Sequence, residues 1–404
     1  MSEDDNQVWS ALVAVGTKAL AVRSASLVKR GLALAKSLQP GDAAAHLNLG
    51  RALKDKGDLD GAIAEYRAAI RLKPDNAGAH RTLGFALDDK GDLDGAIAEY
   101  REALRLNPNH DQTHFFLGFA LAGKGDADGA IAEYREALRL DPNFAAGHCC
   151  LGNALSGKGD WDGAIAEYRE VLRLDPSLDP NLSEVHWSLG IALGRKGDCD
   201  GAIAEYREAL RLDPNAAEVH YNLGIALRHK GDTDCAIAEY REAVRLNPNF
   251  AEAHYCLGLA LESKGDLDGQ IAEYREALRL NPNFAEAHHN LGRALIRQGG
   301  LDGAIAEFRE AVRLNPNNDM AHVSLGVALG RNDDLGGEEI AEYREALRLN
   351  RNNDLAHHNL AVALEWKGDH RGALAEYRAA YELNRKDPDY RQAYERLLQQ
   401  MNRQ

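Results

Sequence analysis

Apolar residues along the chain follow the period of an α-helix. In the segment DGAIAEYREALRL, they fall at i, i+1, i+4, i+7 and i+8, as Ala130, Ile131, Tyr134, Ala137 and Leu138. This spacing places them in one stripe of a helix, with charged residues on the opposite side. The segment before it, DQTHFFLGFALAGKG, predicts another amphipathic helix. The pattern therefore predicts two helices in succession, joined by a short turn.

This pair of segments recurs along the chain with a period of 34 residues. The period is marked by one small residue of the first helix, which is Gly50, Gly84, Gly118, Gly152, Gly190, Gly224, Gly258, Gly292, Gly326 and finally Ala361. The longest step contains extra residues around Pro176 and Pro180, and a shorter insertion precedes Ile340. A single helix pair cannot bury its apolar face, whereas stacked pairs form a continuous core. The ten repeats therefore predict one solenoid.

The segment between the two helices has the residues of a tight turn. In the third repeat, Gly125 lies where a left-handed cap ends the first helix, and Asp126 or Asp128 can cap the second. The same Asp-Leu-Asp-Gly string begins like a calcium loop, but the helix starts before the remaining oxygen ligands of such a loop. Asn-Pro or Asp-Pro then closes each repeat, because proline cannot continue a helix. We interpret the string as a turn with an N-cap.

These motifs resemble the tetratricopeptide repeat family. The resemblance rests on the small residue of the first helix, on Ala96, Tyr100 and Ala103 of the second, and on the closing Pro108, and it extends over residues 43–386. It implies an all-α fold, a right-handed superhelical solenoid of antiparallel helix pairs. The first helices would line its concave face, and the second helices its outside.

Both ends of the repeat array have sequences suited to capping it. Residues 1–42 are expected to hold a degenerate capping repeat at 9–42, and residues 387–404 a C-terminal capping helix. In the latter, Asp387 can cap the helix and Pro388 suits its first turn. Its apolar stripe contains Tyr390, Ala393, Tyr394, Leu397, Leu398 and Met401.

Composition narrows the function classes. The formal net charge of −15 disfavours nucleic-acid and anionic-membrane partners. The number of cysteines is odd and none forms a Cys-x-x-Cys motif, so we expect free thiols in a reducing compartment. An acidic N-terminus and the lack of a long apolar run predict neither a signal peptide nor a membrane span. These features together predict a cytoplasmic protein.

The fourth residue of every repeat is histidine, where the family usually has a bulky apolar or aromatic residue. The ten are His46, His80, His114, His148, His186, His220, His254, His288, His322 and His357. Neighbouring rungs of such a ladder should be too far apart to share a metal ion. We interpret these residues as hydrogen-bonded rings at a helix contact. A pH-dependent stability and a metal site near His148 or His288 are the alternatives.

Residues that vary between repeats are concentrated on the first helices, where they predict a binding groove. One variable stripe is Leu47, Arg81, Phe115, Cys149, Trp187, Tyr221, Tyr255, His289, Val323 and His358; a second is Arg51, Phe85, Phe119, Asn153, Ile191, Ile225, Leu259, Arg293, Val327 and Val362. Exposed aromatic residues in a concave surface suit recognition. The predicted peptide-binding residues are Arg81, Phe85, Phe115, Phe119, Asn153, Trp187, Tyr221, Asn222, Arg228, Tyr255, His289, Asn290 and Arg293.

Charged residues flank this predicted groove on two sides. An acidic wall is expected from Glu184, Glu218, Glu252 and Glu286, and a basic wall from Arg195, Arg228, Arg297 and Arg331. No repeat supplies the first-helix lysine of the family's clamp for chaperone tails. The asparagine ladder of the repeat arm of O-GlcNAc transferases is also interrupted here, for example at Thr82, Phe116 and Cys256.

No catalytic, cofactor or metal motif stands out, because carboxylates and histidines occur as parts of the repeat. The sequence thus predicts a non-enzymatic scaffold that binds an extended or helical peptide of a protein partner in the groove, with Trp187, Tyr221 and Tyr255 as anchors. Self-association into an assembly, the regulatory arm of a multidomain enzyme, and RNA binding are the alternatives.

Overall fold

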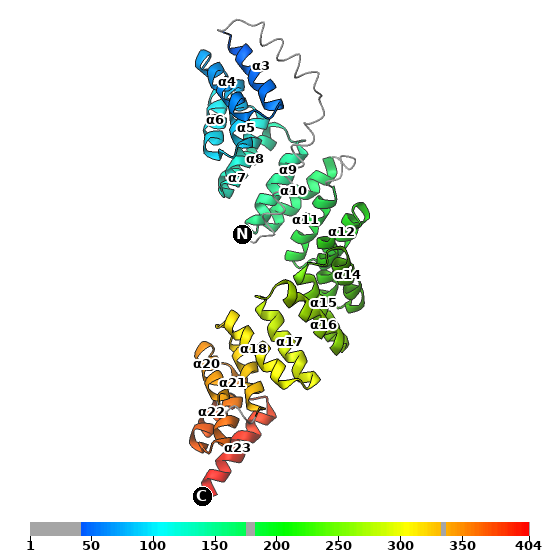
Figure 1. Cartoon of the computed structure of the whole chain (residues 1–404), viewed down its shortest axis with the longest axis vertical. Coiled ribbons are helices and arrows are strands. Elements are labelled where there is room, and N and C mark those ends of the chain that lie inside the picture. The colour runs from blue at the N-terminus through cyan, green and yellow to red at the C-terminus, as the bar shows by residue number, and fades with distance from the viewer. Residues whose placement is uncertain (1–41, 175–181, 333–336, 404) are drawn as a thin grey trace. The chain divides into compact units, whose positions relative to one another are not determined.

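The computed structural model describes residues 42–174, 182–332 and 337–403, and all its regular elements in these ranges are α-helices (Figure 1). Contacts divide the chain into two bodies, residues 1–196 and 197–404. The predicted degenerate repeat, apart from Asp42, and the insertion around Pro176 and Pro180 lie outside the described residues. The single repeat domain over residues 43–386 stays a prediction.

The N-terminal body consists of helices that pair along the chain. In order, they are α3 (Ala43–Asp55), α4 (Leu59–Leu72), α5 (Ala77–Asp89), α6 (Leu93–Leu106), α7 (Asp111–Gly123), α8 (Ala127–Leu140), α9 (Ala145–Gly157), α10 (Trp161–Leu174) and α11 (Leu182–Arg195). From α3 to α10, each helix contacts the one that follows it in this body. The odd-numbered helices are the first helices of the repeats.

The C-terminal body continues the pattern and ends in an additional helix. It contains α12 (Cys199–Leu212), α13 (Ala217–His229), α14 (Thr233–Leu246), α15 (Ala251–Lys264), α16 (Leu267–Leu280), α17 (Ala285–Gln298), α18 (Leu301–Leu314), α19 (Asp319–Gly330), α20 (Glu339–Leu349), α21 (Asp354–Trp366), α22 (His370–Leu383) and α23 (Pro388–Arg403). Leu397 of α23 is buried in a cluster with Tyr377 of α22 and Leu364 of α21. The sequence prediction of helix pairs in a solenoid is confirmed.

In most of the described repeats, the turn between paired helices is fixed by one glycine and one aspartate. Gly125 has φ +82°, a conformation that favours glycine, and follows the last turn of α7. The Oδ1 atom of Asp126 accepts a hydrogen bond from the backbone N–H of Gly129 at 2.9 Å. Asp126 is therefore the N-cap of α8, whereas Asp128 instead forms an ion pair with Lys158 of the next repeat. The interpretation as a turn with an N-cap is confirmed.

Two of the described second helices, α18 and α20, lack this cap, and α18 has glycine in its place. Gly300 precedes α18 with φ −88° and ψ 71°, close to the values of Asp266 before α16, but no side chain caps α18. A Cβ atom at Gly300 would have no neighbour closer than 3.7 Å. We expect Gly300→Asp to raise the free energy of unfolding by about 0.5–1 kcal/mol, through the new cap and the helix dipole. Urea denaturation followed by circular dichroism would measure this change. Asp266→Gly should lower stability similarly, and a destabilised Gly300→Asp would contradict the prediction.

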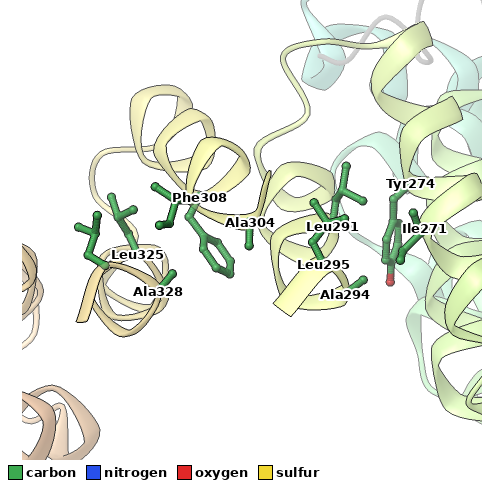
Figure 2. Packing of buried hydrophobic residues seen from close by; sticks show 11 residues of the cluster. Ile271, Tyr274, Leu291, Ala294, Leu295, Ala304, Phe308, Leu325 and Ala328 are labelled. Atoms are coloured by element: carbon green, nitrogen blue, oxygen red, sulfur yellow. The ribbon is translucent and has the colours of Figure 1, made fainter. Parts of the chain in front are cut away.

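The core consists of tyrosines that pack over the small residue of the first helix. In the C-terminal body, one cluster runs from Tyr274 of α16 through Leu291 of α17 and Phe308 of α18 to Leu325 of α19 (Figure 2). A Cβ atom on Gly258 would lie 2.6 Å from the ring of Tyr274, so the tyrosine requires this glycine. The ring therefore fixes how closely the two helices of a repeat approach.

Gln270 is an exception in this core. It occupies the place that alanine has in the neighbouring repeats, at Ala236 and Ala304, and it is 1% exposed. Its Nε2 atom has no hydrogen-bond partner among the described residues. A buried unpaired donor costs about 1–3 kcal/mol. We expect Gln270→Ala to stabilise the chain by about 1 kcal/mol after the loss of packing atoms, because the other repeats close around alanine.

The measurement for this prediction is the unfolding midpoint in urea. Ala236→Gln provides the matched control, because it creates the same buried amide in α14 and should destabilise the chain. A Gln270→Ala variant that is less stable than the wild type would show that the amide is satisfied.

Candidate peptide-binding face

The variable residues lie together on the first helix of each repeat. We number each repeat so that the histidine found in every repeat is its fourth residue. The fifth, ninth and thirteenth residues are then spaced at i, i+4 and i+8 and share one side of the helix. We call the surface formed by these three positions the first-helix face. It contains most of the predicted peptide-binding residues, and Asn222, Asn290 and Arg228 lie beside it.

In the N-terminal body, two predicted residues of α5 already have partners. The guanidinium group of Arg81 contacts the ring of His110, the N-cap residue of α7. Phe85 packs edge-on against Phe116, with ring centroids 4.4 Å apart, and the ammonium group of Lys54 lies 5.7 Å from its centroid. Both side chains are half-buried. Phe116 thus packs against the ring of Phe85 on the preceding first helix.

Phe115 of α7 packs against two other aromatic rings. Its ring lies 4.8 Å from that of Phe144 and 5.8 Å from that of Tyr134. Phe119, on the same helix, is also half-buried. Trp187 of α11 is half-buried too, and its Nε1 atom has no partner among the described residues.

Asn153 has a structural partner within its own repeat. Its Oδ1 atom accepts a hydrogen bond of 2.7 Å from the hydroxyl of Tyr168. The hydroxyl of the core tyrosine thus contacts a residue of the first-helix face. The same occurs in the last repeat, where Tyr377 donates to Glu365 at 2.9 Å.

In the C-terminal body, the two predicted tyrosine anchors are packed against phenylalanines. The ring of Tyr221 lies 4.8 Å from that of Phe250, and the ring of Tyr255 lies 4.7 Å from that of Phe284. The expectation of exposed aromatic anchors is therefore wrong for these residues, which are half-buried. The sequence contains a signal for this contact, because phenylalanine precedes the next first helix after Phe115, Tyr221 and Tyr255.

A polar network joins three predicted residues on α15 and α17. Asn290 donates to the hydroxyl of Tyr255 at 2.9 Å, and Arg293 donates to Asn290 Oδ1 at 3.3 Å. Arg293 also pairs with Glu262 at 3.3 Å, and Arg297 lies 3.8 Å from the same carboxylate. Glu262 was missed in the sequence prediction, although it is the twelfth residue of its repeat, as Arg228 is. Two guanidinium groups thus share one carboxylate.

The remaining predicted residues of this body lie outside that network. Asn222 is half-buried, and the Nε atom of Arg228 is buried without a partner among the described residues. The ring nitrogen Nε2 of His289 forms a hydrogen bond of 2.9 Å with Ser324 Oγ. Burial, followed by the nearby charge of Arg293, lowers the pKa of His289. These side chains vary in charge and shape from one repeat to the next.

The predicted acidic wall has an unequal exposure. Glu218, Glu252 and Glu286 are exposed and form no ion pair among the described residues. Glu184 is half-buried, and burial raises its pKa. The three exposed carboxylates begin successive first helices, where the helix dipole favours negative charge.

Trp366 is a second residue that the sequence prediction missed. It is the thirteenth residue of the last repeat and is 90% exposed, whereas Val362, one turn earlier, is 36% exposed. The same position is polar or glycine in the other repeats, for example Arg297 and Arg331. The fold therefore does not require an aromatic residue there. Val323, in contrast, was placed in a surface stripe and is only 2% exposed.

The histidine ladder forms a repeated hydrogen-bond clamp. Its Nδ1 atoms lie 2.5–2.7 Å from a glutamate Oε2 of the second helix, and its Nε2 atoms lie 2.9–3.3 Å from a backbone carbonyl that precedes the repeat. The histidines with both contacts are His80, His114, His148, His220, His254, His288, His322 and His357. The interpretation as hydrogen-bonded rings at a helix contact is confirmed.

The cysteines and histidines provide no metal site among the described residues. All five cysteines are free, and burial raises the pKa of Cys149 to about 11. The described residues contain no group of three or more His, Cys, Asp or Glu side chains that could hold a metal ion. Across the same parts of the chain, no helix combines the length and apolar character needed to cross a membrane.

Comparison with known proteins places the chain among repeat proteins. Models described as tetratricopeptide repeat match residues 145–178, 187–249, 239–272 and 289–354, and one described as TPR repeat matches 50–89, 86–125, 120–159 and 263–299. No curated protein matches the chain.

Solved structures with similarity to the chain include repeat proteins of different lengths. MamA is 32% identical, over 41% of this chain and 95% of that chain, with a TM-score of 0.38. YrrB, described as a TPR protein with an unusual peptide-binding site, is 21% identical, over 47% and 96%, with a TM-score of 0.42. Yeast Tom70 is 18% identical, over 89% and 96%, with a TM-score of 0.40. Since the family models match repeats from residue 50 to residue 354, the chain belongs to the tetratricopeptide repeat family.

Proposed function

We propose that this protein is a non-enzymatic scaffold that binds an extended or helical peptide segment of a protein partner on its first-helix face. The observation that carries the proposal is the contrast between positions. The core tyrosine and the small first-helix residue that it packs over are buried and nearly constant between repeats. The first-helix face, in contrast, is partly exposed and varies. A constant framework with a varied surface suits selective recognition, because each repeat offers a different subsite.

Charge supports a peptide as the ligand. Exposed carboxylates begin α13, α15 and α17, while Arg293 and Arg297 lie further along α17. An extended segment that crosses successive helices meets a different charge at each step, which fixes its register and direction. The overall net charge of −15 disfavours RNA for the same surface.

The test compares partner capture by variants that leave the core intact. Glu218→Lys with Glu252→Lys reverses two exposed charges beside the first-helix face, and Arg241→Glu with Arg275→Glu reverses two on the second helices α14 and α16. All are exposed, so folding should be retained, as circular dichroism would check. A lysate protein retained by the wild type and the second variant but lost by the first supports the proposal. Equal retention by both variants, or loss only in the second, would contradict it.

A further inference from the structure

The last three repeats combine arginines with an exposed tryptophan on one surface. Helices α17, α19 and α21 are successive first helices, and neighbours among them are in contact. At the thirteenth position they carry Arg297, Arg331 and Trp366, and at the ninth Arg293, Val327 and Val362. The same structural position thus changes from cationic to apolar along three adjacent helices.

The arginines of this surface are incompletely neutralised. Arg293 and Arg297 share the single carboxylate of Glu262, and Arg331 forms no ion pair among the described residues. Glu365, at the twelfth position of the last repeat, is held by Arg396 of α23 at 2.6 Å and by the hydroxyl of Tyr377. The ninth and thirteenth positions of the three helices thus carry arginines and no carboxylate, on a chain with a net charge of −15. Guanidinium forks favour carboxylate ligands, which they can bind with two hydrogen bonds.

The apolar end of the surface has no role in the core. Trp366 is 90% exposed and Val362 is 36% exposed, and they are one turn apart on α21. The C-terminal helix α23 packs against α22 and leaves both side chains uncovered. An exposed tryptophan places a large apolar area in contact with water, which is unfavourable. Tryptophan is also enriched among the residues that dominate binding energies.

We propose that the first-helix face of α17, α19 and α21 binds an acidic segment of a partner protein that carries one aromatic or branched aliphatic anchor. Arg297 and Arg331 bind its carboxylates, and Trp366 with Val362 packs on the anchor. This inference rests on the proposed function and names the partner chemistry of its C-terminal end. The occupant follows from charge complementarity, because a basic or neutral segment would leave Arg331 without a counter-charge and Arg293 and Arg297 with one carboxylate between them.

Helix spacing sets the pattern of the segment. Packed helices lie about 10 Å apart, and an extended chain advances about 3.3 Å per residue. Carboxylates about three residues apart therefore reach Arg297 and Arg331, and the anchor follows about three residues later. These are internal side chains, so a free C-terminal carboxylate is not required.

Binding of a designed peptide to the full chain tests the inference. The probe is a fluorescein-labelled Gly/Ser peptide with blocked ends, two Glu three residues apart and Phe three residues later; its counterpart has Lys in place of Glu. We expect fluorescence anisotropy to show binding of the Glu peptide only. Trp366→Ala should weaken binding about tenfold or more. Arg297→Gln with Arg331→Gln should weaken it similarly at low salt, and less at high salt.

Matched substitutions elsewhere in the same body control for general effects. Leu383→Ala removes another exposed apolar side chain, and Arg241→Gln with Arg275→Gln removes two exposed arginines of second helices. Both should leave the affinity unchanged. Equal binding of the Lys peptide, no binding by the wild type up to about 1 mM, or unchanged affinity in the Trp366 and arginine variants would overturn the inference. A dimer that Trp366→Ala abolishes would also overturn it, in favour of a second copy as occupant.

The two proposals fail in different ways. Partner capture that depends on Glu218 and Glu252, combined with indifference to Trp366, would retain the scaffold function and reject the acidic segment. Partner capture that no first-helix variant alters would reject the scaffold function itself.

Discussion

Raising the pH from about 6 to about 8.5 is expected to destabilise this protein, because the folded structure raises the pKa of five histidines of the ladder. A carboxylate and a backbone carbonyl can only accept hydrogen bonds, so a ring with one of each at its two nitrogens donates from both. These contacts favour the imidazolium form of the ring. Eight described histidines have this arrangement.

The pKa shifts give the sign of the effect. At His114, burial alone lowers the pKa. The hydrogen bonds to Glu133 and to the carbonyl of Pro108, together with the charges of Glu133 and Glu136, raise the pKa by more than burial lowers it, so the net shift is upward. The pKa is likewise raised at His220, His254, His288 and His357. A raised folded-state pKa stabilises the fold fully below the unfolded value of about 6.5, and this contribution is lost as the pH rises through the folded value.

We expect the melting temperature to fall by about 5 °C or more over this range, since 1 kcal/mol corresponds to about 2–4 °C for bodies of about 200 residues. Differential scanning calorimetry would measure it. Burial lowers the pKa of His110, His289 and His358, which opposes the trend. A variant with glutamine at Glu133, Glu239, Glu273, Glu307 and Glu376 isolates the ladder, because it removes the five partner charges. Equal pH slopes for the variant and the wild type would show that the rings are neutral.

The repeat made much of the fold predictable from sequence. Its period and the helical stripe predict the helix pairs, and Gly125 with Asp126 predicts the turn, because these features depend on residues close together in the chain. The repeated histidine also had a predictable role, although its glutamate partner lies 19 residues away. That partner could have been found, because it occurs at a constant position in every copy.

The candidate site was less predictable, because exposure depends on contacts between repeats. Tyr221 and Tyr255 have the spacing of surface residues, yet each loses one side of its ring to a phenylalanine from the next repeat. Trp366 is exposed because the helix that follows its repeat, α23, packs elsewhere. The residue pattern of a single repeat predicts neither the burial of these tyrosines nor the exposure of this tryptophan. Charge sharing at Glu262 likewise requires the relative placement of α15 and α17.

Replacing a core tyrosine by alanine is expected to have the second large effect, and Tyr100 of α6 allows the cleanest comparison. Its ring is fully buried between α5 and α6, where a Cβ atom on Gly84 would lie 2.6 Å away, and it also contacts Phe85 and Phe116. Tyr100→Ala leaves a cavity the size of the ring. We expect it to lower the free energy of unfolding by about 3–5 kcal/mol.

Tyr100→Phe, which removes only the hydroxyl, is expected to leave stability unchanged or to raise it. The hydroxyl is buried without a hydrogen-bond partner among the described residues, and burial, with the nearby charges of Asp88 and Asp89, raises its pKa. Removing an unpaired buried hydroxyl should be neutral or stabilising, as Phe308 at the same position of another repeat indicates. Tyr168→Phe is the control, because it breaks the 2.7 Å bond to Asn153 and should cost about 0.5–1.5 kcal/mol.

Urea denaturation followed by circular dichroism separates the three variants. Because stability in a solenoid is a sum of repeat and interface terms, the loss in Tyr100→Ala should appear first in the repeats around α5 and α6. Hydrogen exchange would locate it there. If Tyr100→Phe proves as costly as Tyr168→Phe, the Tyr100 hydroxyl has a partner, and the tyrosine is kept for that bond. If it is neutral, the ring alone holds the helix pair together, and the buried hydroxyl contributes nothing to stability.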